Sequence, residues 1–130
     1  MGADTTEVKL LMQNDFNDTV AKYQIVKSAR LYREELAIAA LDYETNRILA
    51  AQAADDMLNI SGITASFVLF PDKWQTIISA RSIGKVNVQV VLEALGGGGN
   101  AMVAGAQMKD TEVKQALSRL IESIDKFYEG

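Results

Sequence analysis

The stretch Ala65-Ser-Phe-Val-Leu-Phe-Pro-Asp-Lys-Trp-Gln-Thr-Ile-Ile-Ser-Ala-Arg-Ser82 decides the fold. Its first part, Ala65 to Phe70, is nearly continuous in apolar residues, which is typical of a central strand buried on both faces. Pro71-Asp72-Lys73 has the composition of a turn. The part from Trp74 to Ser82 alternates and predicts a return strand. One face of that strand is expected to carry Ile77, Ser79 and Arg81, and the other Ile78, Ala80 and Ser82.

Upstream of this hairpin the sequence predicts two helices separated by extended chain. Apolar residues recur at three- and four-residue steps over 5–27, which favours a helix. The segment 29–43 favours strand, folded back at Arg33-Glu34-Glu35 in a tight turn. Thr45 is expected to cap the next helix, which Ser61-Gly62 ends.

Downstream of the hairpin one segment is ambiguous and two are clear. Over 86–95, valines alternate with Asn87 and Gln89, and β-branched residues favour strand. Yet Val86, Val90, Ala94 and Leu95 also fit a helix stripe. Residues 104–108 predict a short strand, and 111–128 predict a helix with apolar residues along one side.

Together these elements predict an α/β (α+β) fold, a single domain with a mixed β-sheet of about five short strands flanked by helices. The chain has 130 residues, which is the size of one domain. We expect this domain to span 4–130, with an N-terminal helix over 5–27, a sheet-and-helix core over 29–109 and a C-terminal helix over 111–128. Residues 1–3 are expected to be a cloning remnant, and neither a signal peptide nor a membrane span is predicted.

The composition excludes several kinds of chemistry. The chain has no histidine and no cysteine, so it lacks the commonest metal ligand and the commonest general acid or base, and it cannot form a Ser-His or Cys-His nucleophile pair. The formal net charge of −4 at pH 7 argues against broad electrostatic capture of a polyanion. Any phosphate binding is therefore expected to be local, through backbone amides and a few placed cations.

Four consecutive glycines, Gly96, Gly97, Gly98 and Gly99, follow an apolar run and precede Asn100. Glycine loses more backbone freedom on folding than any other residue, so a fold that keeps such a run commonly needs bare backbone there. The commonest use is to bring peptide N–H groups close to a phosphate. The alternative is a flexible linker, or the end of a helix followed by a loose turn.

Arg81 is the side chain best suited to bind an anion. It lies near the end of the predicted return strand between Ser79 and Ser82, and a guanidinium with flanking hydroxyls can clamp a phosphate. Asn87 and Gln89 follow and supply neutral hydrogen-bonding groups. Taken alone, Arg81 is more simply a surface arginine paired with a carboxylate. With the glycine run about fifteen residues later, it favours a nucleotide or phosphodiester site.

The acidic pairs predict no metal centre. Asp55-Asp56 are neighbours on a predicted helix and point about 100° apart, so they cannot both face one ligand. Glu34-Glu35 are expected to be solvated in their turn. Trp74 and Tyr32 could stack on a base, although lone aromatic residues beside strands more often pack in the core or at its rim.

Four motifs follow one another in the second half of the chain: Ile78-Ser-Ala-Arg-Ser82, Val86-Asn-Val-Gln89, Glu93-Ala-Leu-Gly-Gly-Gly-Gly99 and Ala104-Gly-Ala-Gln107. Their order and spacing resemble the C-terminal, substrate-binding domain of the DHH phosphodiesterases, in which an upstream half carries an Asp-His-His signature. Ala50-Ala-Gln-Ala-Ala-Asp55 and Ala65-Ser-Phe-Val68 strengthen this resemblance. Ile25-Val-Lys-Ser-Ala29 and Leu31-Tyr-Arg33, ahead of Ala37-Ile-Ala39, point to the GdpP-like subgroup, membrane-anchored bacterial phosphodiesterases that cleave cyclic di-AMP. The resemblance covers nearly all of residues 8–128.

The resemblance implies a structure and a ligand. The segment 86–95 should be a helix, the glycine run should follow it and line a phosphodiester site, and Arg81 with its serines should face the same cleft. Manganese is expected on the upstream DHH half, so no cofactor is expected in this chain. The parent protein is expected to be anchored in the bacterial plasma membrane with this domain on the cytoplasmic side, and this chain is expected to make no membrane contact of its own.

Asn100 departs from the family pattern, which usually has histidine directly after the glycines. Asparagine can hydrogen-bond to a phosphate or a base, but it cannot carry a positive charge or transfer a proton near pH 7. A positioning role is therefore expected for Asn100, and no catalytic residue is expected in this chain.

The leading hypothesis is the nucleotide-binding half of a manganese-dependent cyclic dinucleotide phosphodiesterase, inactive without the upstream DHH domain of the same polypeptide. The expected substrate-binding residues are Ser79, Arg81, Ser82, Asn87, Gln89, Gly96, Gly97, Gly98, Gly99 and Asn100. One alternative is a nucleic-acid-binding domain of a DHH-family oligoribonuclease or single-strand exonuclease, against which the acidic balance argues. Another is a dimerisation module that uses the first helix to bind a second copy of the chain.

Overall fold

The computed structural model describes the backbone of residues 5–130 and the side chains of residues 16–130. The expected cloning remnant at 1–3 lies outside the described residues. The helices are α1 (Thr5–Ser28), α2 (Arg47–Leu58), α3 (Val88–Glu93) and α4 (Val113–Glu129). The strands are β1 (Arg30–Tyr32), β2 (Leu36–Ala40), β3 (Ala65–Asp72), β4 (Gln75–Ser82), β5 (Gly98–Gly99) and β6 (Val103–Lys109).

The strands form one six-stranded sheet in the order β1-β2-β3-β4-β6-β5. At its centre β3 and β4 pair antiparallel from Ala65↔Ser82 to Asp72↔Gln75, as the stretch 65–82 predicts. β2 and β3 run parallel, and the chain passes from one to the other through α2. The sheet is therefore mixed and the predicted α/β fold is confirmed.

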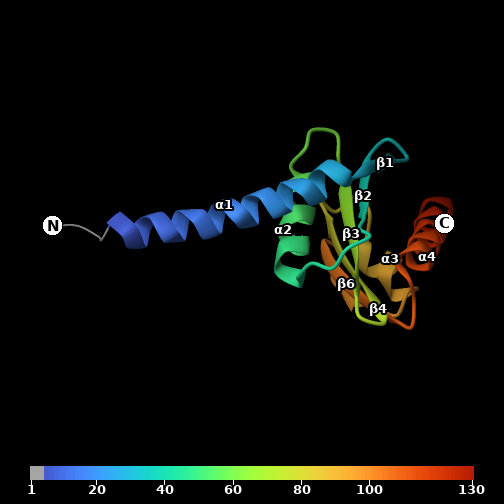
Figure 1. Cartoon of the computed structure of the whole chain (residues 1–130). Helices are drawn as coiled ribbons and strands as arrows, with labels where there is room; N and C mark the ends of the chain where they lie inside the picture. Colours follow the sequence, from blue (N-terminus) through green and yellow to red (C-terminus); the bar gives the residue numbers. More distant parts are fainter. Residues whose placement is uncertain (1–4) are drawn as a thin grey trace.

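Helices cover both faces of this sheet (Figure 1). α1 and α2 lie on one face, and α3 and α4 lie on the other. The alternation along the strands separates two cores: Phe67 and Ile78 are buried under α3 and α4, whereas Phe70 and Ile77 are buried under α1 and α2. Complete burial of one such phenylalanine side chain stabilises the fold by roughly 1.5–3 kcal/mol. The alternation predicted along β4 is thus the device that gives the sheet its two packed faces.

Small side chains let α2 lie close to the sheet. Ala50, Ala53 and Ala54 are fully buried, and the Ser66 hydroxyl on β3 donates a hydrogen bond to the Ala54 carbonyl at 2.6 Å. The helix begins one residue later than predicted, because the Asn46 side chain, not Thr45, accepts a hydrogen bond from a backbone N–H of the first turn.

The glycine run supplies an unexpected sixth strand. Gly98 and Gly99 form β5, which pairs with β6 at the edge of the sheet, so the sheet has six strands where about five were predicted. The central turn also differs from the prediction, because Pro71 and Asp72 extend β3 and the turn falls at Lys73-Trp74. The pairing of β2 with β3 ends at Ala40↔Leu69, so Pro71 lies where no neighbour needs its missing N–H.

The ambiguous segment 86–95 contains helix α3, as the family resemblance implies and against its strand propensity. The Asn87 side chain caps this helix by accepting a hydrogen bond from the Val90 N–H at 3.2 Å. Val88, Val91 and Leu92 are buried against the sheet and α4. The cap and the burial of one helix face together outweigh the β-branched composition.

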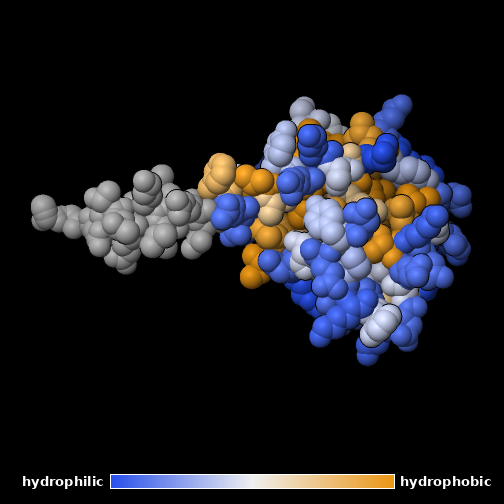
Figure 2. Space-filling model, viewed as in Figure 1, coloured by the Kyte–Doolittle hydropathy of each residue, from blue (hydrophilic) through white to orange (hydrophobic). Residues whose placement is uncertain are grey.

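α1 is one unbroken helix whose N-terminal part extends well beyond the sheet (Figure 1). Figure 2 shows apolar side chains at the surface where α1 meets the rest of the domain. On α1 the Phe16 and Tyr23 side chains are 65% and 63% exposed, whereas Ile25 is buried. Over the described part of the chain, no helix combines the length and the apolar character needed to cross a membrane.

Candidate functional site

The glycine run begins as the end of helix α3. Gly96 has φ 84°, a left-handed conformation that favours glycine. Its N–H donates to the Glu93 carbonyl at 3.1 Å, and the Gly97 N–H donates to the Leu92 carbonyl at 2.8 Å. This pair of bonds is the Schellman arrangement that closes a helix. The N–H groups of Gly96 and Gly97 are therefore used within the chain, where they close α3.

The next glycines lie against β6 with almost no space between the backbones. A Cβ built on Gly97 would lie 2.3 Å from the Gly105 carbonyl oxygen, and one on Gly99 would lie 2.3 Å from the Val103 carbonyl oxygen. A Cβ on Gly98 would meet nothing within 4 Å, and Gly98 has no left-handed φ. Packing and conformation thus require glycine at the other positions of the run but not at Gly98, which faces open space.

That open space is a groove of about 510 Å³. It exists because α2 packs on β3 and β4, so the same face of β6 and β5 carries no helix. The groove is lined by Arg47, Ile77, Ile78, Ser79, Gly96, Gly97, Gly98, Gly105, Ala106, Gln107 and Lys109. Two of these residues are cationic and none is acidic, although the whole chain has a net charge of −4.

Of the three predicted residues on β4, Ser79, Arg81 and Ser82, one lines this groove and two do not. Ser79 lines it, as expected. Arg81 lies on the same face of the strand, but its Nε donates to Asp55 at 2.9 Å and Nη1 donates to the Ala80 carbonyl, so a carboxylate already balances its charge. Ser82 lies on the opposite face, 2% exposed, where its hydroxyl accepts a hydrogen bond from the Gly84 N–H at 2.9 Å. Within this chain, Arg81 and Ser82 are thus bound to other parts of the domain, and Ser79 is the member of the three that lines the groove.

The predicted polar residues around α3 lie outside the groove lining. Asn87 is occupied as the cap of α3, and Gln89 is half-buried on that helix. The Asn100 side chain accepts hydrogen bonds from the backbone N–H groups of Met102 and Val103, both at 2.9 Å. Asn100 thus shapes the turn between β5 and β6, which is a positioning role within the chain itself.

Sequence reasoning missed three polar residues of the groove: Arg47, Gln107 and Lys109. With the Gln107 amide turned so that its oxygen faces Arg47, that oxygen accepts from both terminal nitrogens of the guanidinium, Nη1 at 3.2 Å. Gln107 could have been found from the alternation of β6, because it pairs with Ile77 and so shares the face of Ser79. Arg47 could not, because its place depends on how α2 lies over the sheet.

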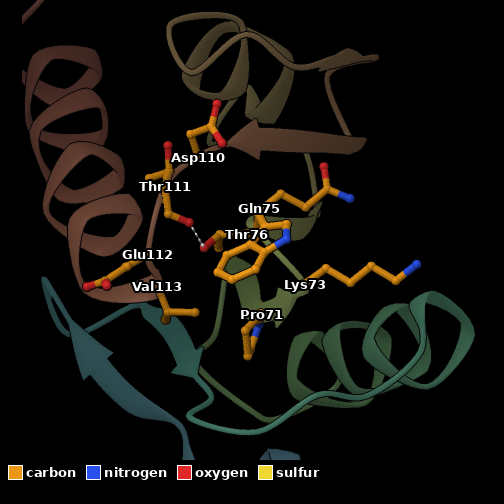
Figure 3. Close-up of a pocket in the computed structure, with 9 residues that line it drawn as sticks. Pro71, Lys73, Gln75, Thr76, Asp110, Thr111, Glu112 and Val113 are labelled. Carbon is orange, nitrogen blue, oxygen red and sulfur yellow. Dashed lines mark hydrogen bonds between the residues drawn. The ribbon is translucent and has the colours of Figure 1, made fainter.

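A second cavity of about 440 Å³ lies at the other side of the central hairpin, between the β3–β4 turn and the start of α4 (Figure 3). Within its lining, the Thr76 hydroxyl donates to the Thr111 carbonyl at 2.8 Å. Trp74 borders this cavity with its side chain 85% exposed, and Lys73, Asp110 and Glu112 give the lining mixed charge. The cavity contains none of the predicted site residues.

Glu35 is not the solvated turn residue that the sequence predicts. It accepts hydrogen bonds from Lys85 Nζ at 2.7 Å and from the Tyr128 hydroxyl at 2.6 Å, and these bonds lower the pKa of its carboxyl. Burial, together with the bond to Glu35, raises the pKa of Tyr128 to about 12. This cluster holds the end of α4 against the β1–β2 hairpin and lies away from the groove.

Tyr32 and Arg33 extend the same cluster. The Tyr32 hydroxyl donates to Asp125 at 2.6 Å, and Arg33 forms an ion pair with Asp125 at 3.0 Å. The bond from Tyr32 is the main reason that the pKa of Asp125 is lowered. The Arg33 guanidinium also lies 4.5 Å from the centre of the Tyr128 ring. The Tyr32 hydroxyl therefore links β1 to α4, a structural role that differs from stacking on a base.

The described residues contain no cluster of side chains suited to manganese. Among the described residues, no group of three or more Asp or Glu side chains is close enough to hold a metal, and the whole sequence lacks histidine and cysteine. Asp55 and Asp56 point apart, as predicted, so each pairs with a different cation, Arg81 and Lys22 respectively.

The architecture is that of a mixed-sheet α/β domain with helices on both faces and a groove beside a glycine-containing edge strand. Residues 33–129 match the DHHA1 domain. The chain therefore belongs to the DHHA1 domain family, and the resemblance drawn from its motifs is confirmed.

The curated relatives point to the same subgroup. The chain is 42% identical over 134 residues to the cyclic-di-AMP phosphodiesterase PdeA of Listeria monocytogenes serotype 1/2a (strain 10403S), covering 100% of this chain and 20% of the relative. It is 38% identical over 134 residues to the cyclic-di-AMP phosphodiesterase GdpP of Bacillus subtilis (strain 168), covering 99% and 20%. The chain thus spans about a fifth of the length of these relatives.

A solved structure supports the fold independently. An exopolyphosphatase-related protein from Bacteroides fragilis superposes with a TM-score of 0.71 at 20% sequence identity, covering 85% of this chain and 34% of that chain. At this identity the likeness concerns the fold alone.

Proposed function

We propose that this chain is the ligand-binding domain of a cyclic di-AMP phosphodiesterase and that it is inactive by itself. Its similarity to the two phosphodiesterases supports the ligand class. The observation that carries the binding role is the groove at Gly98, which combines two cations, no carboxylate and a glycine that the surrounding structure does not require. An anionic ligand matches that combination in charge and in shape.

In this proposal the glycines provide space, and side chains provide the hydrogen bonds. The ligand lies over the bare backbone of Gly98 and Gly105, where a side chain would hold it off. The Ser79 hydroxyl and the Lys109 ammonium then reach its phosphate oxygens. The chain binds and orients the phosphodiester, and the metal and the residues that activate water belong to the upstream part of the polypeptide, anchored at the cytoplasmic face of the membrane.

A titration of the 130-residue chain tests this function. Cyclic di-AMP, its linear form pApA and a longer oligonucleotide are compared by calorimetry at two salt concentrations. Cyclic di-AMP is expected to bind with a shallow salt dependence, and Gly98→Val, which fills the groove, is expected to weaken binding by at least ~10-fold. Lys114→Gln, an exposed change on α4, serves as the control and should leave the affinity unchanged.

Two results would contradict the proposal. One is equal affinity of the wild type and Gly98→Val for cyclic di-AMP. The other is hydrolysis of cyclic di-AMP by the isolated chain with added manganese. Stronger binding of the longer strand with a steep salt dependence would favour the nucleic-acid alternative instead.

One observation favours a second role in self-association. Phe16, Val20 and Tyr23 recur at helical spacing on α1 and are all exposed, so they form an apolar stripe that this chain does not cover. Light scattering of the wild type and Tyr23→Glu tests it, because a dimer that uses this stripe should dissociate in the variant. A wild type that is monomeric at all concentrations would rule it out.

A further inference from the structure

Arg47 and Gln107 meet in the groove from two different elements. Arg47 is the first residue of α2, and Gln107 lies on β6. With the Gln107 amide oxygen turned toward Arg47, the guanidinium donates to that oxygen, with Nη1 at 3.2 Å. This contact fixes the orientation of the amide, so the branch that remains for a ligand is Nε2, which has two N–H groups and no acceptor.

Apart from Ser79, the polar side chains that line the groove offer donors only to a ligand. The Arg47 guanidinium, the Gln107 Nε2 group and the Lys109 ammonium all donate and cannot accept. No acidic residue lines the groove. A phosphate group, which only accepts, satisfies such a set, whereas the amine-bearing edge of adenine would find no acceptor among these three side chains.

The electrostatics of helix α2 do not explain the position of Arg47. The N-terminus of a helix carries a partial positive charge, so a cation there is repelled, and the first turn of α2 contains no acidic residue to offset it. Arg47 is exposed, so burial of its side chain does not explain it either. The contrast with Arg81 is clear, because Asp55 already neutralises Arg81 at 2.9 Å.

We propose that Arg47 and Gln107 form a clamp for the second phosphate of the ligand, the one that does not lie over Gly98. The inference rests on the proposed function, since it takes the ligand to be a dinucleotide with two phosphates. It assigns the clamp to phosphate recognition and not to base recognition. A ligand with one phosphate therefore gains nothing from Arg47.

Two variants of the 130-residue chain test the clamp. Arg47→Gln is expected to weaken binding of cyclic di-AMP and of pApA, which have two phosphates, by ~10-fold, and to leave binding of ApA, which has one, unchanged. Gln107→Glu keeps the contact to Arg47 as an ion pair but puts an anion in the clamp, so it should weaken the first two ligands at least as much. Lys114→Gln and Gln52→Glu, exposed changes of the same charge elsewhere, are the matched controls.

Thermal unfolding separates this effect from a loss of structure. Removing a cation from the N-terminus of α2 should leave the melting temperature of Arg47→Gln equal to the wild type or higher. If cyclic di-AMP binds and Gly98→Val weakens it, but Arg47→Gln and Gln107→Glu behave as their controls do, the clamp is wrong and the proposed function stands. An equal loss for ApA and cyclic di-AMP in Arg47→Gln would also overturn it.

If the wild type binds no dinucleotide, the proposed function fails, and inorganic pyrophosphate decides the clamp. Its titration is followed through the NMR signals of the Gln107 side-chain amide. A shift of these signals that Arg47→Gln abolishes supports the clamp, and the absence of a shift in the wild type overturns it.

Discussion

Gly98 is the one glycine of the run for which neither the backbone conformation nor the packing requires glycine. Gly96 needs its left-handed φ of 84°, and Gly97 and Gly99 have no room for a Cβ against β6. The sequence shows that bare backbone is needed in this run. It cannot show which glycine is needed for a left-handed φ and which for close packing, because the packing depends on the position of β6.

An alanine substitution at each of two adjacent glycines separates packing from function. Gly97→Ala is expected to destabilise the chain by roughly 1–3 kcal/mol, because its Cβ would overlap the Gly105 carbonyl and the Ala106 side chain. Gly98→Ala places its Cβ in open space and should change the free energy of unfolding by less than ~0.5 kcal/mol. Urea unfolding of the two variants measures both values. Equal destabilisation would show that β5 and β6 do not lie as described.

The residues around Arg81 show which features of the candidate site could be predicted from the sequence and which could not. The alternation of β4 was predicted correctly, and it already puts Arg81 and Ser82 on opposite faces of the strand. Placing both in one cleft conflicts with that alternation. The pairing of Arg81 with Asp55, which lies on α2, was the simpler interpretation offered for a lone arginine, and the structure contains it.

At the scale of elements, the cluster around Glu35 and Tyr128 fastens helix α4. Hydrogen bonds and ion pairs join the end of this helix to the β1–β2 turn. The turn at 33–35 and the helix were both predicted from the sequence, and both exist. The contact between them was not predictable, because its partners are separated by about ninety residues.

This cluster makes stability depend on pH at both ends of the scale. The folded state lowers the pKa of Glu35, so the stabilisation is present above its ordinary pKa of 4.5 and is lost as the pH falls below that value. The folded state raises the pKa of Tyr128 from 10.0 to about 12, so that contribution is present below pH 10 and is lost as the pH rises through 12.

Two substitutions check this dependence. Glu35→Gln should flatten the loss of stability below pH 4.5, and Tyr128→Phe should reduce the loss above pH 10. Tyr128→Phe is also expected to cost about 1–2 kcal/mol at neutral pH, because Glu35 loses one hydrogen bond. Urea unfolding between pH 3 and pH 11 measures these effects. An acid limb in Glu35→Gln as steep as in the wild type would refute the assignment.

At the scale of the whole molecule, the main feature is the part of the sheet, on β5 and β6, that α2 does not cover. Helices cover the sheet on both sides except where β6 and β5 pass α2, and the groove occupies that gap. The alternating strands and the long helices could be predicted because each follows a local period. The groove could not, because it arises from where α2 ends relative to β6. In the proposal, this open side is where an upstream catalytic half would meet the ligand.

The central claim is that the groove at Gly98 binds the phosphodiester ligand. Its most direct test is an NMR titration of the 130-residue chain with cyclic di-AMP, with the backbone amides assigned. The account predicts that the largest shifts map to Ser79, Gly98 and Gln107 and that Gly98→Val abolishes them. Shifts confined to the cavity beside Trp74, or shifts that persist unchanged in Gly98→Val, would contradict it.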